Sequence, residues 1–170
     1  IQPEDYAAWR PLWDGYNAFY GRHGATALPE HITEVTWQRF FDPAEPVFAL
    51  VAESHGQLVG LSHYLFHRST TRLHDVCYLQ DLFTAPSHRG RGVGRQLIEA
   101  VYAAARAAGC AFFDAYAWMG GRGLSMRMAA SICSFQSRAA EWVDCAAAPE
   151  AAMNDPAMAK PPSNVRACIR

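Results

Sequence analysis

The sequence has few of the features that mark a membrane protein or a nucleic-acid-binding protein. None of its apolar runs approaches the roughly 20 residues that a helix needs to span a bilayer. The first residues, Ile1–Asp5, lack the basic and apolar regions of a signal peptide. A net charge of −1 over 170 residues supplies no overall basic field. We therefore expect a cytoplasmic protein without nucleic acid or a membrane as partner, and small-molecule chemistry fits this composition better.

Paired cysteines are also lacking. The cysteines are odd in number and scattered, and no two of them form a C-x-x-C pair. They are Cys77, Cys110, Cys133, Cys145 and Cys168. We expect reduced thiols and no metal site.

What the sequence does contain is the pattern of one globular domain, since 51% of its residues are hydrophobic and 18% charged. Aromatic residues recur at spacings of three and four from Pro3 to Tyr20, which predicts an amphipathic helix that Pro11 kinks or restarts. We interpret this stripe as core, with a tyrosine in a substrate cleft as the alternative. The stripe comprises Tyr6, Trp9, Trp13, Tyr16 and Tyr20. A second helix is expected from about Pro29 to Phe41.

Three runs rich in β-formers follow. Val47–Ala52 and Leu58–Phe66 flank a glycine-containing turn and predict an antiparallel hairpin, and Val76–Thr84 continues the sheet. A helix that ends at Gly109 and a further strand, Cys110–Trp118, come next. The fold class is therefore α/β, with a mixed, mainly antiparallel sheet flanked by helices.

The most informative segment is the loop between the third strand and the next helix. It holds Gly90, Gly92 and Gly94, and glycine lets the backbone turn its N–H groups toward a ligand. A helix start adds about half a positive charge, so the segment predicts a phosphate cradle. Its arginines are Arg89, Arg91 and Arg95. The alternative is a tight surface turn with solvated arginines.

The phosphate ligand is harder to identify from the residues. A Walker loop needs Gly-Lys-Ser or Gly-Lys-Thr, and the chain has neither. A dinucleotide fold places its glycines after the first strand, whereas here they follow a hairpin and two helices. Asp114 lies about twenty residues after Gly94, as a ribose-binding acid would, so NAD binding stays open as a rival interpretation.

The loop resembles that of the GCN5-related N-acetyltransferases (GNAT family). Arg89-x-x-Gly92-x-Gly94 matches the pattern Arg/Gln-x-x-Gly-x-Gly/Ala, and Asp81–Pro86 is similar to that family's central strand. The resemblance runs from Pro3 to about Trp118.

This resemblance implies acetyl-coenzyme A as cosubstrate. Its pantetheine arm would lie in a splayed parallel pair, Val76–Thr84 and Cys110–Trp118. Backbone groups of Leu82, Phe83 and Thr84 would pair with that arm. The pyrophosphate would be held by N–H groups of Arg89, Gly90, Arg91, Gly92, Val93, Gly94 and Arg95. A homodimer is a further implication.

Acetyl transfer also needs a base. An alkyl ammonium with a pKa near 10.4 must lose a proton before it attacks a thioester, which costs roughly 4–5 kcal/mol at pH 7. The candidates are Asp81, His63 and His74, and the resemblance favours Asp81 as the catalytic residue. The alternative for Asp81 is a local hydrogen bond, and for the histidines a structural role is preferred. A backbone N–H of Leu82 or Phe83 would stabilise the oxyanion.

The C-terminal third departs from the family pattern. Beyond Tyr116 the chain has no tyrosine, although the family places a proton-donating tyrosine on the following helix. We expect an acetyl-CoA-binding N-acetyltransferase domain over residues 1–118 and an atypical Ala-, Ser- and Pro-rich segment over 119–170. Our hypothesis is that this segment is translated out of frame, with a divergent native terminus as the alternative.

Three functions are consistent with these residues. The first is transfer of an acetyl group from acetyl-CoA to a primary amine of a small molecule or protein. The second is a coenzyme-A-binding domain without catalysis, which the missing tyrosine favours. The third is binding of a dinucleotide.

Overall fold

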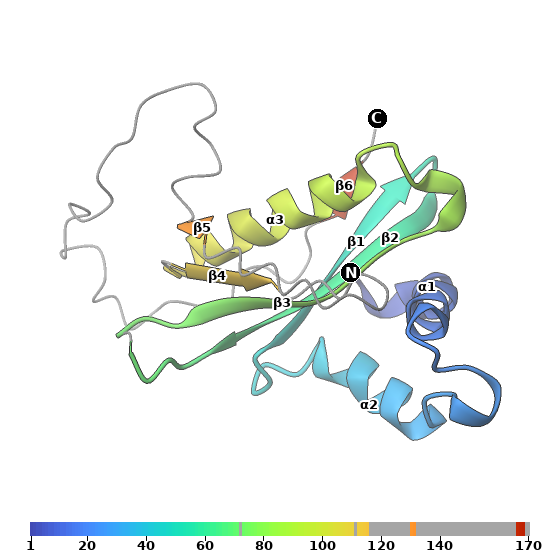
Figure 1. Cartoon of the computed structure of the whole chain (residues 1–170), viewed down its shortest axis with the longest axis horizontal. Helices are drawn as coiled ribbons and strands as arrows, with labels where there is room; N and C mark the ends of the chain where they lie inside the picture. Colours follow the sequence, from blue (N-terminus) through green and yellow to red (C-terminus); the bar gives the residue numbers. More distant parts are fainter. Residues whose placement is uncertain (72, 111, 116–129, 132–165, 169–170) are drawn as a thin grey trace.

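The computed structural model describes residues 1–71, 73–110, 112–115, 130–131 and 166–168. It shows a mixed sheet with strand order β5-β4-β3-β2-β1-β6. Figure 1 shows α3 on one face of this sheet and α1 with α2 on the other. Neighbouring strands are antiparallel in the pairs β1/β2, β2/β3 and β4/β5, and parallel in β3/β4 and β1/β6. The expected fold class, an acetyltransferase-like α/β fold, is therefore confirmed.

The aromatic stripe forms the buried side of α1 (Tyr6–Phe19), which follows a 3-10 turn at Pro3–Asp5. The helix runs through Pro11 without restarting, because Pro11 is exposed and only one backbone bond is lost there. The second helix, α2, spans Glu30–Arg39, close to the expected range. Both helices pack on the sheet through a cluster of buried apolar residues. This α1-side cluster comprises Ile1, Trp9, Leu12, Trp13, Tyr16, Phe40, Ala49, Val51, Leu61 and Phe83.

The first two strands form the expected hairpin. β1 (Val47–Ser54) pairs with β2 (Gln57–His67) across a two-residue turn in which His55 and Gly56 both have positive φ, 50° and 76°. Such a turn matches the right-handed twist of antiparallel strands. The hairpin supplies the centre of the sheet, on which β3 is then added.

The third strand, β3, spans Val76–Thr84, the bounds that its sequence predicts. Its register against β2 shifts once: His63 lies opposite Asp81 and Tyr64 opposite Leu79, which leaves Gln80 as an extra residue in β3. Such a bulge reverses the alternation of side chains along the strand. Leu79 accordingly packs on the α3 side, whereas Phe83 packs on the α1 side.

The helix after the loop, α3, spans Val93–Ala107 and ends before Gly109, which has a φ of 70°. It buries one side against β1, β2 and β3. The α3-side cluster comprises Phe48, Leu50, Ala52, Val59, Tyr64, Cys77, Leu79, Val93, Leu97, Val101, Tyr102, Ala105 and Cys110. The free thiols of Cys77 and Cys110 lie in this cluster, and their pKa values are raised by burial.

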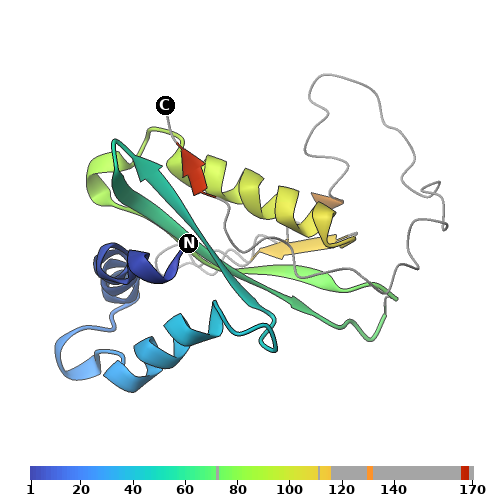
Figure 2. The ribbon, with the colours of Figure 1, turned by 180° about the vertical axis from the view of Figure 1, so that it is seen from behind.

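The remaining strands are short. β4 (Phe112–Ala115) covers the middle of the expected strand 110–118, whose last three residues lie outside the described ranges. β5 (Ala130–Ser131) pairs with β4, and Figure 2 shows β6 (Arg166–Cys168) beside β1. The rest of the segment 119–170, on which we expect an atypical composition, also lies outside the described residues.

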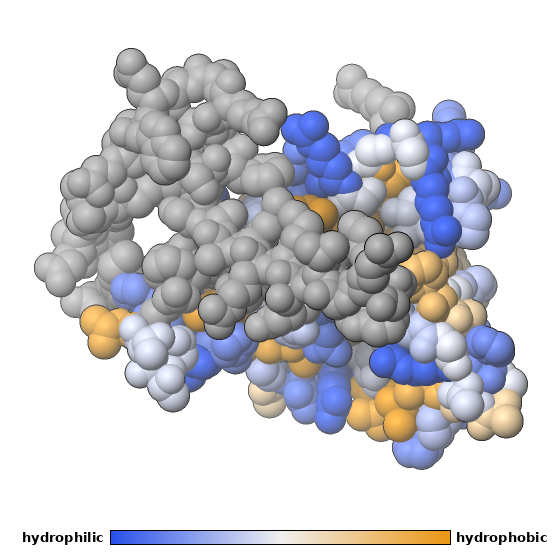
Figure 3. Space-filling model, in the orientation of Figure 1, coloured by the Kyte–Doolittle hydropathy of each residue, from blue (hydrophilic) through white to orange (hydrophobic). Residues whose placement is uncertain are grey.

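Helix α2 leaves part of its apolar surface exposed. Figure 3 shows apolar side chains over the region where α2 lies, and Ile32 and Val35 of this helix are 40% and 42% exposed. Single exposed apolar side chains of this kind are common in soluble proteins. No helix among the described residues is long and apolar enough to cross a membrane.

Candidate active site

The loop from β3 to α3 has the backbone geometry that its glycines predict. A 3-10 turn at Pro86–His88 leads into Gly90 and Gly92, whose φ values are 74° and 82°. L residues rarely adopt this left-handed region, so both turns depend on glycine. A Cβ atom at either position would meet no atom within 4 Å, so it is backbone conformation and not crowding that requires glycine here.

Helix α3 begins directly against the end of β3. A Cβ atom on Gly94 would lie 3.7 Å from Oγ1 of Thr84 and 3.9 Å from Cδ2 of Leu82. The first amides of an α-helix have no partner within the helix, so those of Val93, Gly94 and Arg95 remain available to an anion. The end of β3, the glycine turn and the start of α3 therefore form one continuous surface that suits a pyrophosphate.

The side chain of Arg89 folds back onto β3. Its Nε donates a hydrogen bond to the carbonyl oxygen of Thr84 at 3.2 Å, and its Cζ lies 5.7 Å from the centre of the Phe83 ring. Arg95 forms an exposed ion pair with Glu99 at 2.8 Å, one turn along α3. Arg89 and Arg95 thus place positive charge around the loop.

The second half of β3 has one edge that β4 does not cover in the described ranges. The parallel pairing of β3 with β4 ends at Leu79 opposite Ala115. Beyond that point, Asp81–Thr84 pair with β2 on the other side. The residues expected to pair with pantetheine, Leu82–Thr84, lie on this stretch, next to the glycine turn.

Asp81 and His63, which the sequence offers as separate candidates, lie together in the structure. Nδ1 of His63 is 2.9 Å from Oδ2 of Asp81, and Nε1 of Trp9 donates to Nε2 of His63 at 3.1 Å. All three side chains are buried. Because an indole N–H can only donate, Nε2 must accept and the ring proton must sit on Nδ1, from which it is donated to Asp81.

Tyr16 of α1 completes this buried group. Burial raises the pKa of its phenol, and the neighbouring Asp81 carboxylate raises it further. Sequence reasoning kept a tyrosine of the α1 stripe in a substrate cleft as an alternative, but it did not single out Tyr16 or Trp9. The sequence signal for these two residues was the aromatic stripe of α1, but the stripe does not indicate which strand residues the helix covers.

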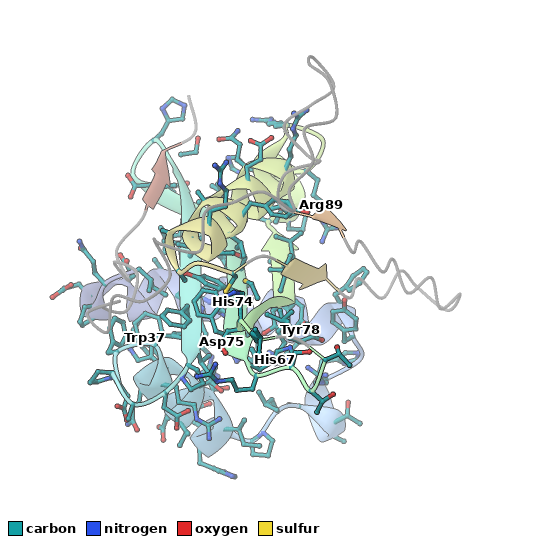
Figure 4. All side chains as sticks on the ribbon, turned by 90° about the vertical axis from the view of Figure 1, so that its left-hand side faces the viewer. Trp37, His67, His74, Asp75, Tyr78 and Arg89 are labelled. Atoms are coloured by element: carbon teal, nitrogen blue, oxygen red, sulfur yellow. The ribbon has the colours of Figure 1, made fainter. Side chains whose placement is uncertain are left out.

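His74 lies apart from this group. It precedes β3 by two residues, whereas Asp81 lies five residues after the start of that strand, and at about 3.3 Å per residue about 16 Å of strand separates Val76 from Asp81. Figure 4 places His74, Asp75 and His67 around the end where β2 and β3 are joined, away from Arg89. The structure thus brings His63 to Asp81 and leaves His74 at the far end of the strand. Among the described residues no cluster of side chains suits a metal ion.

Comparison with known proteins identifies the class of molecule to which this site belongs. The model of the acetyltransferase (GNAT) family matches residues 9–119, and the chain belongs to this family. D-amino-acid N-acetyltransferase HPA3 of Saccharomyces cerevisiae is 36% identical over 107 residues, which cover 62% of this chain. The matched region spans 64% of the length of that yeast relative.

Solved structures share the fold. The structure of AAC(6')-Iy with the bisubstrate analogue CoA-S-monomethyl-acetylneamine has a TM-score of 0.59 at 19% identity, over 71% of this chain and 78% of that one. Ribosomal-protein-alanine N-acetyltransferase from Brucella melitensis biovar Abortus 2308 also has a TM-score of 0.59 at 19% identity, over 85% and 92%. The family resemblance read from the loop is confirmed, and the dinucleotide-binding alternative is not favoured.

Proposed function

We propose that the protein is an N-acetyltransferase that transfers an acetyl group from acetyl-CoA to a primary amine. The observation that carries this proposal is the turn from β3 into α3, with left-handed backbone at Gly90 and Gly92 and a helix start behind it. Each charge-assisted N–H contact contributes roughly 1.5–3 kcal/mol. Three or four such contacts would supply most of a micromolar affinity, which is about 8 kcal/mol.

In this proposal acetyl-CoA lies along the edge of β3 that β4 does not cover in the described residues. Backbone groups of Leu82, Phe83 and Thr84 pair with the pantetheine arm, and amides from Arg89 to Arg95 hold the pyrophosphate. The continuity of these two stretches supports the assignment, because the first turn of α3 packs directly against Leu82 and Thr84.

Asp81 is the proposed base. The ammonium of the acceptor gives up one proton, and its nitrogen attacks the thioester carbonyl. The new C–N bond forms, the C–S bond breaks, and the nitrogen loses a second proton as the amide forms. The sulfur leaves as thiolate and takes up one proton, so that one proton is released overall. Asp81 is the candidate to receive the ammonium proton, directly or through water, whereas the Nε2 lone pair of His63 already accepts the N–H of Trp9.

The acceptor is a primary amine of a small molecule or a protein, and a free amino acid is the first one to test. The yeast relative at 36% identity is named for D-amino acids, while AAC(6')-Iy was solved with an aminoglycoside-derived analogue. Fold alone carries no substrate, so the sequence relative outweighs the structural one. A cytoplasmic location and a homodimer stay predictions from sequence and family resemblance.

Thiol release tests the proposal. The purified chain is mixed with acetyl-CoA and a panel of amines that includes D- and L-amino acids, and free thiol is followed by absorbance. Turnover with an amine and none without one is the expected result. Binding of acetyl-CoA without thiol release for any amine would instead favour the non-catalytic coenzyme-A-binding domain.

A further inference from the structure

The position of Asp81 on the α1 face depends on the bulge at Gln80. Leu79 packs on the α3 side of the sheet, and an uninterrupted strand would send Asp81 to that same apolar side. The extra residue reverses the alternation, so that Asp81 lies opposite His63 beneath α1. A bulge of this kind re-aims a side chain, and here it places a carboxylate next to an imidazole.

The hydrogen bonds of this group run in one direction. Trp9 donates to Nε2 of His63 at 3.1 Å, and Nδ1 of His63 lies 2.9 Å from Oδ2 of Asp81. Since the indole N–H of Trp9 can donate but not accept, this series of hydrogen bonds requires a neutral imidazole that carries its proton on Nδ1. Both nitrogens of His63 are thereby engaged.

Aromatic side chains pack around the ring of His63. The rings of Phe40 and Trp13 lie 4.7 and 5.1 Å from it, centre to centre, and His63 is only 3% exposed. Adding a proton to Nε2 would break the bond from Trp9 and leave two donors facing each other.

Tyr16 of α1 lies next to Asp81, and the charges of Tyr20 and Arg22 act on Tyr16. At the end of α2, the ring of Phe40 is in contact with His63. Asp81 is therefore the charged group that His63 faces directly.

We propose that Trp9 and His63 are positioning residues, which fix one orientation of the Asp81 carboxylate toward the acceptor amine. This inference rests on the proposed acetyl transfer, in which Asp81 receives the proton. His63 does not take up the proton itself. Its Nδ1–H holds one carboxylate oxygen at 2.9 Å, and Tyr16 of α1 lies against the same carboxylate, so the carboxylate keeps one orientation beneath α1.

Two substitutions at His63 separate positioning from packing. In His63→Asn the amide nitrogen can take the place of Nδ1 and still donate to Asp81. In His63→Gln the amide reaches the place of Nε2, keeps a partner for Trp9 and loses the donor to Asp81. We expect His63→Gln to lower kcat by about 10- to 100-fold, and His63→Asn to keep kcat within about threefold of wild type, with KM for acetyl-CoA little changed in both.

Trp9→Phe removes the N–H donor and keeps an aromatic ring. With Nε2 released, the imidazole can move its proton to Nε2 and lose the donor to Asp81, so we expect Trp9→Phe to lower kcat with KM for acetyl-CoA little changed. Circular dichroism and acetyl-CoA titration show whether each variant is folded. If one of the two His63 variants fails to fold, the other is compared with wild type.

The ring proton can be observed without any turnover. Long-range ¹H–¹⁵N correlation spectra of the full chain should show His63 neutral at pH 7, protonated on Nδ1 and bare at Nε2. A proton on Nε2, a charged ring, or equal losses of kcat in His63→Asn and His63→Gln would overturn the proposal. If wild type binds acetyl-CoA but releases no thiol with any amine, the proposed function fails and the role of Asp81 toward an acceptor fails with it, while the spectrum still decides the tautomer.

Discussion

Gly60 of β2 and Val93 at the start of α3 approach each other so closely that a Cβ atom on Gly60 would lie 3.0 Å from Cγ1 of Val93. The same atom would lie 3.0 Å from the carbonyl oxygen of Phe83, which is backbone and cannot rotate away. The glycine therefore sets how near the helix start comes to the sheet, and with it the position of the proposed pyrophosphate cradle.

Gly60→Ala is expected to lower the free energy of unfolding by about 1–3 kcal/mol, since overpacking a core has this cost. It should also weaken acetyl-CoA binding, because the first turn of α3 must move outward. Chemical denaturation and calorimetry measure the two effects. Ser62→Ala is the matched control on the same strand: in the described part of the chain the buried Ser62 Oγ has no hydrogen-bond partner, so its removal should cost little. Equal losses in both variants would contradict this account.

Gly92→Ala tests the glycine turn itself. Its φ of 82° is strained for alanine, which predicts a loss of about 1–2 kcal/mol in stability. Gly21 has a similar φ of 77°, and a Cβ atom there would also meet nothing within 4 Å. Gly21→Ala should therefore lose similar stability and keep its affinity for acetyl-CoA, whereas Gly92→Ala should lose affinity by tenfold or more, since one charge-assisted contact is worth roughly 1.5–3 kcal/mol. Unchanged binding in Gly92→Ala would place the pyrophosphate elsewhere.

Tyr16 gives the stability a dependence on alkaline pH. Burial, and then the charge of Asp81, raise the pKa of its phenol in the folded chain above the ordinary value of 10.0. The stabilisation from this group is thus fully present below pH 10 and is lost as the pH rises toward the folded pKa, because only the unfolded chain then releases the proton. The slope is about 1.4 kcal/mol per pH unit for one such group.

Denaturation curves at pH 9 to 11 check this dependence. Tyr16→Phe should be less steeply destabilised above pH 10 than wild type. Burial also raises the pKa of Tyr64. Because Tyr64 is present in both proteins, it contributes equally to the pH dependence of their stability. Parallel slopes for the two proteins would show that Tyr16 ionises as freely in the folded chain as in the unfolded one.

The gene sequence tests the hypothesis of a frame shift. The family match ends at residue 119, where the sequence loses the family pattern. If residues 119–170 are translated out of frame, a single-base insertion or deletion near codon 119 should restore a helix that contains asparagine and tyrosine. A gene in which no such change restores it would support a divergent native terminus.

Sequence reasoning located the main strands and the glycine turn well. The bounds of β3, the hairpin before it and the glycine turn after it follow from local patterns, namely β-formers, turn residues and a helix start, and such patterns act within a few residues. The very short β5 and β6 could not be predicted, since two or three residues carry no periodicity.

The buried group around Asp81 lay beyond sequence reasoning for a different reason. One extra residue at Gln80 reverses which face the following side chains occupy, and no local signal announces a bulge. The partners of Asp81 also come from positions 9, 16 and 63, which only the docking of α1 on the sheet brings together. The role of Arg89 at the pyrophosphate stays a prediction, and its contacts with Thr84 and Phe83 could be known only from the structure.

Calorimetric titration of the full chain with acetyl-CoA, with NAD as control, tests the central claim most directly. The account predicts binding of acetyl-CoA with a dissociation constant in the micromolar range, equivalent to about 8 kcal/mol, and no binding of NAD. A folded chain that binds no acetyl-CoA would contradict it.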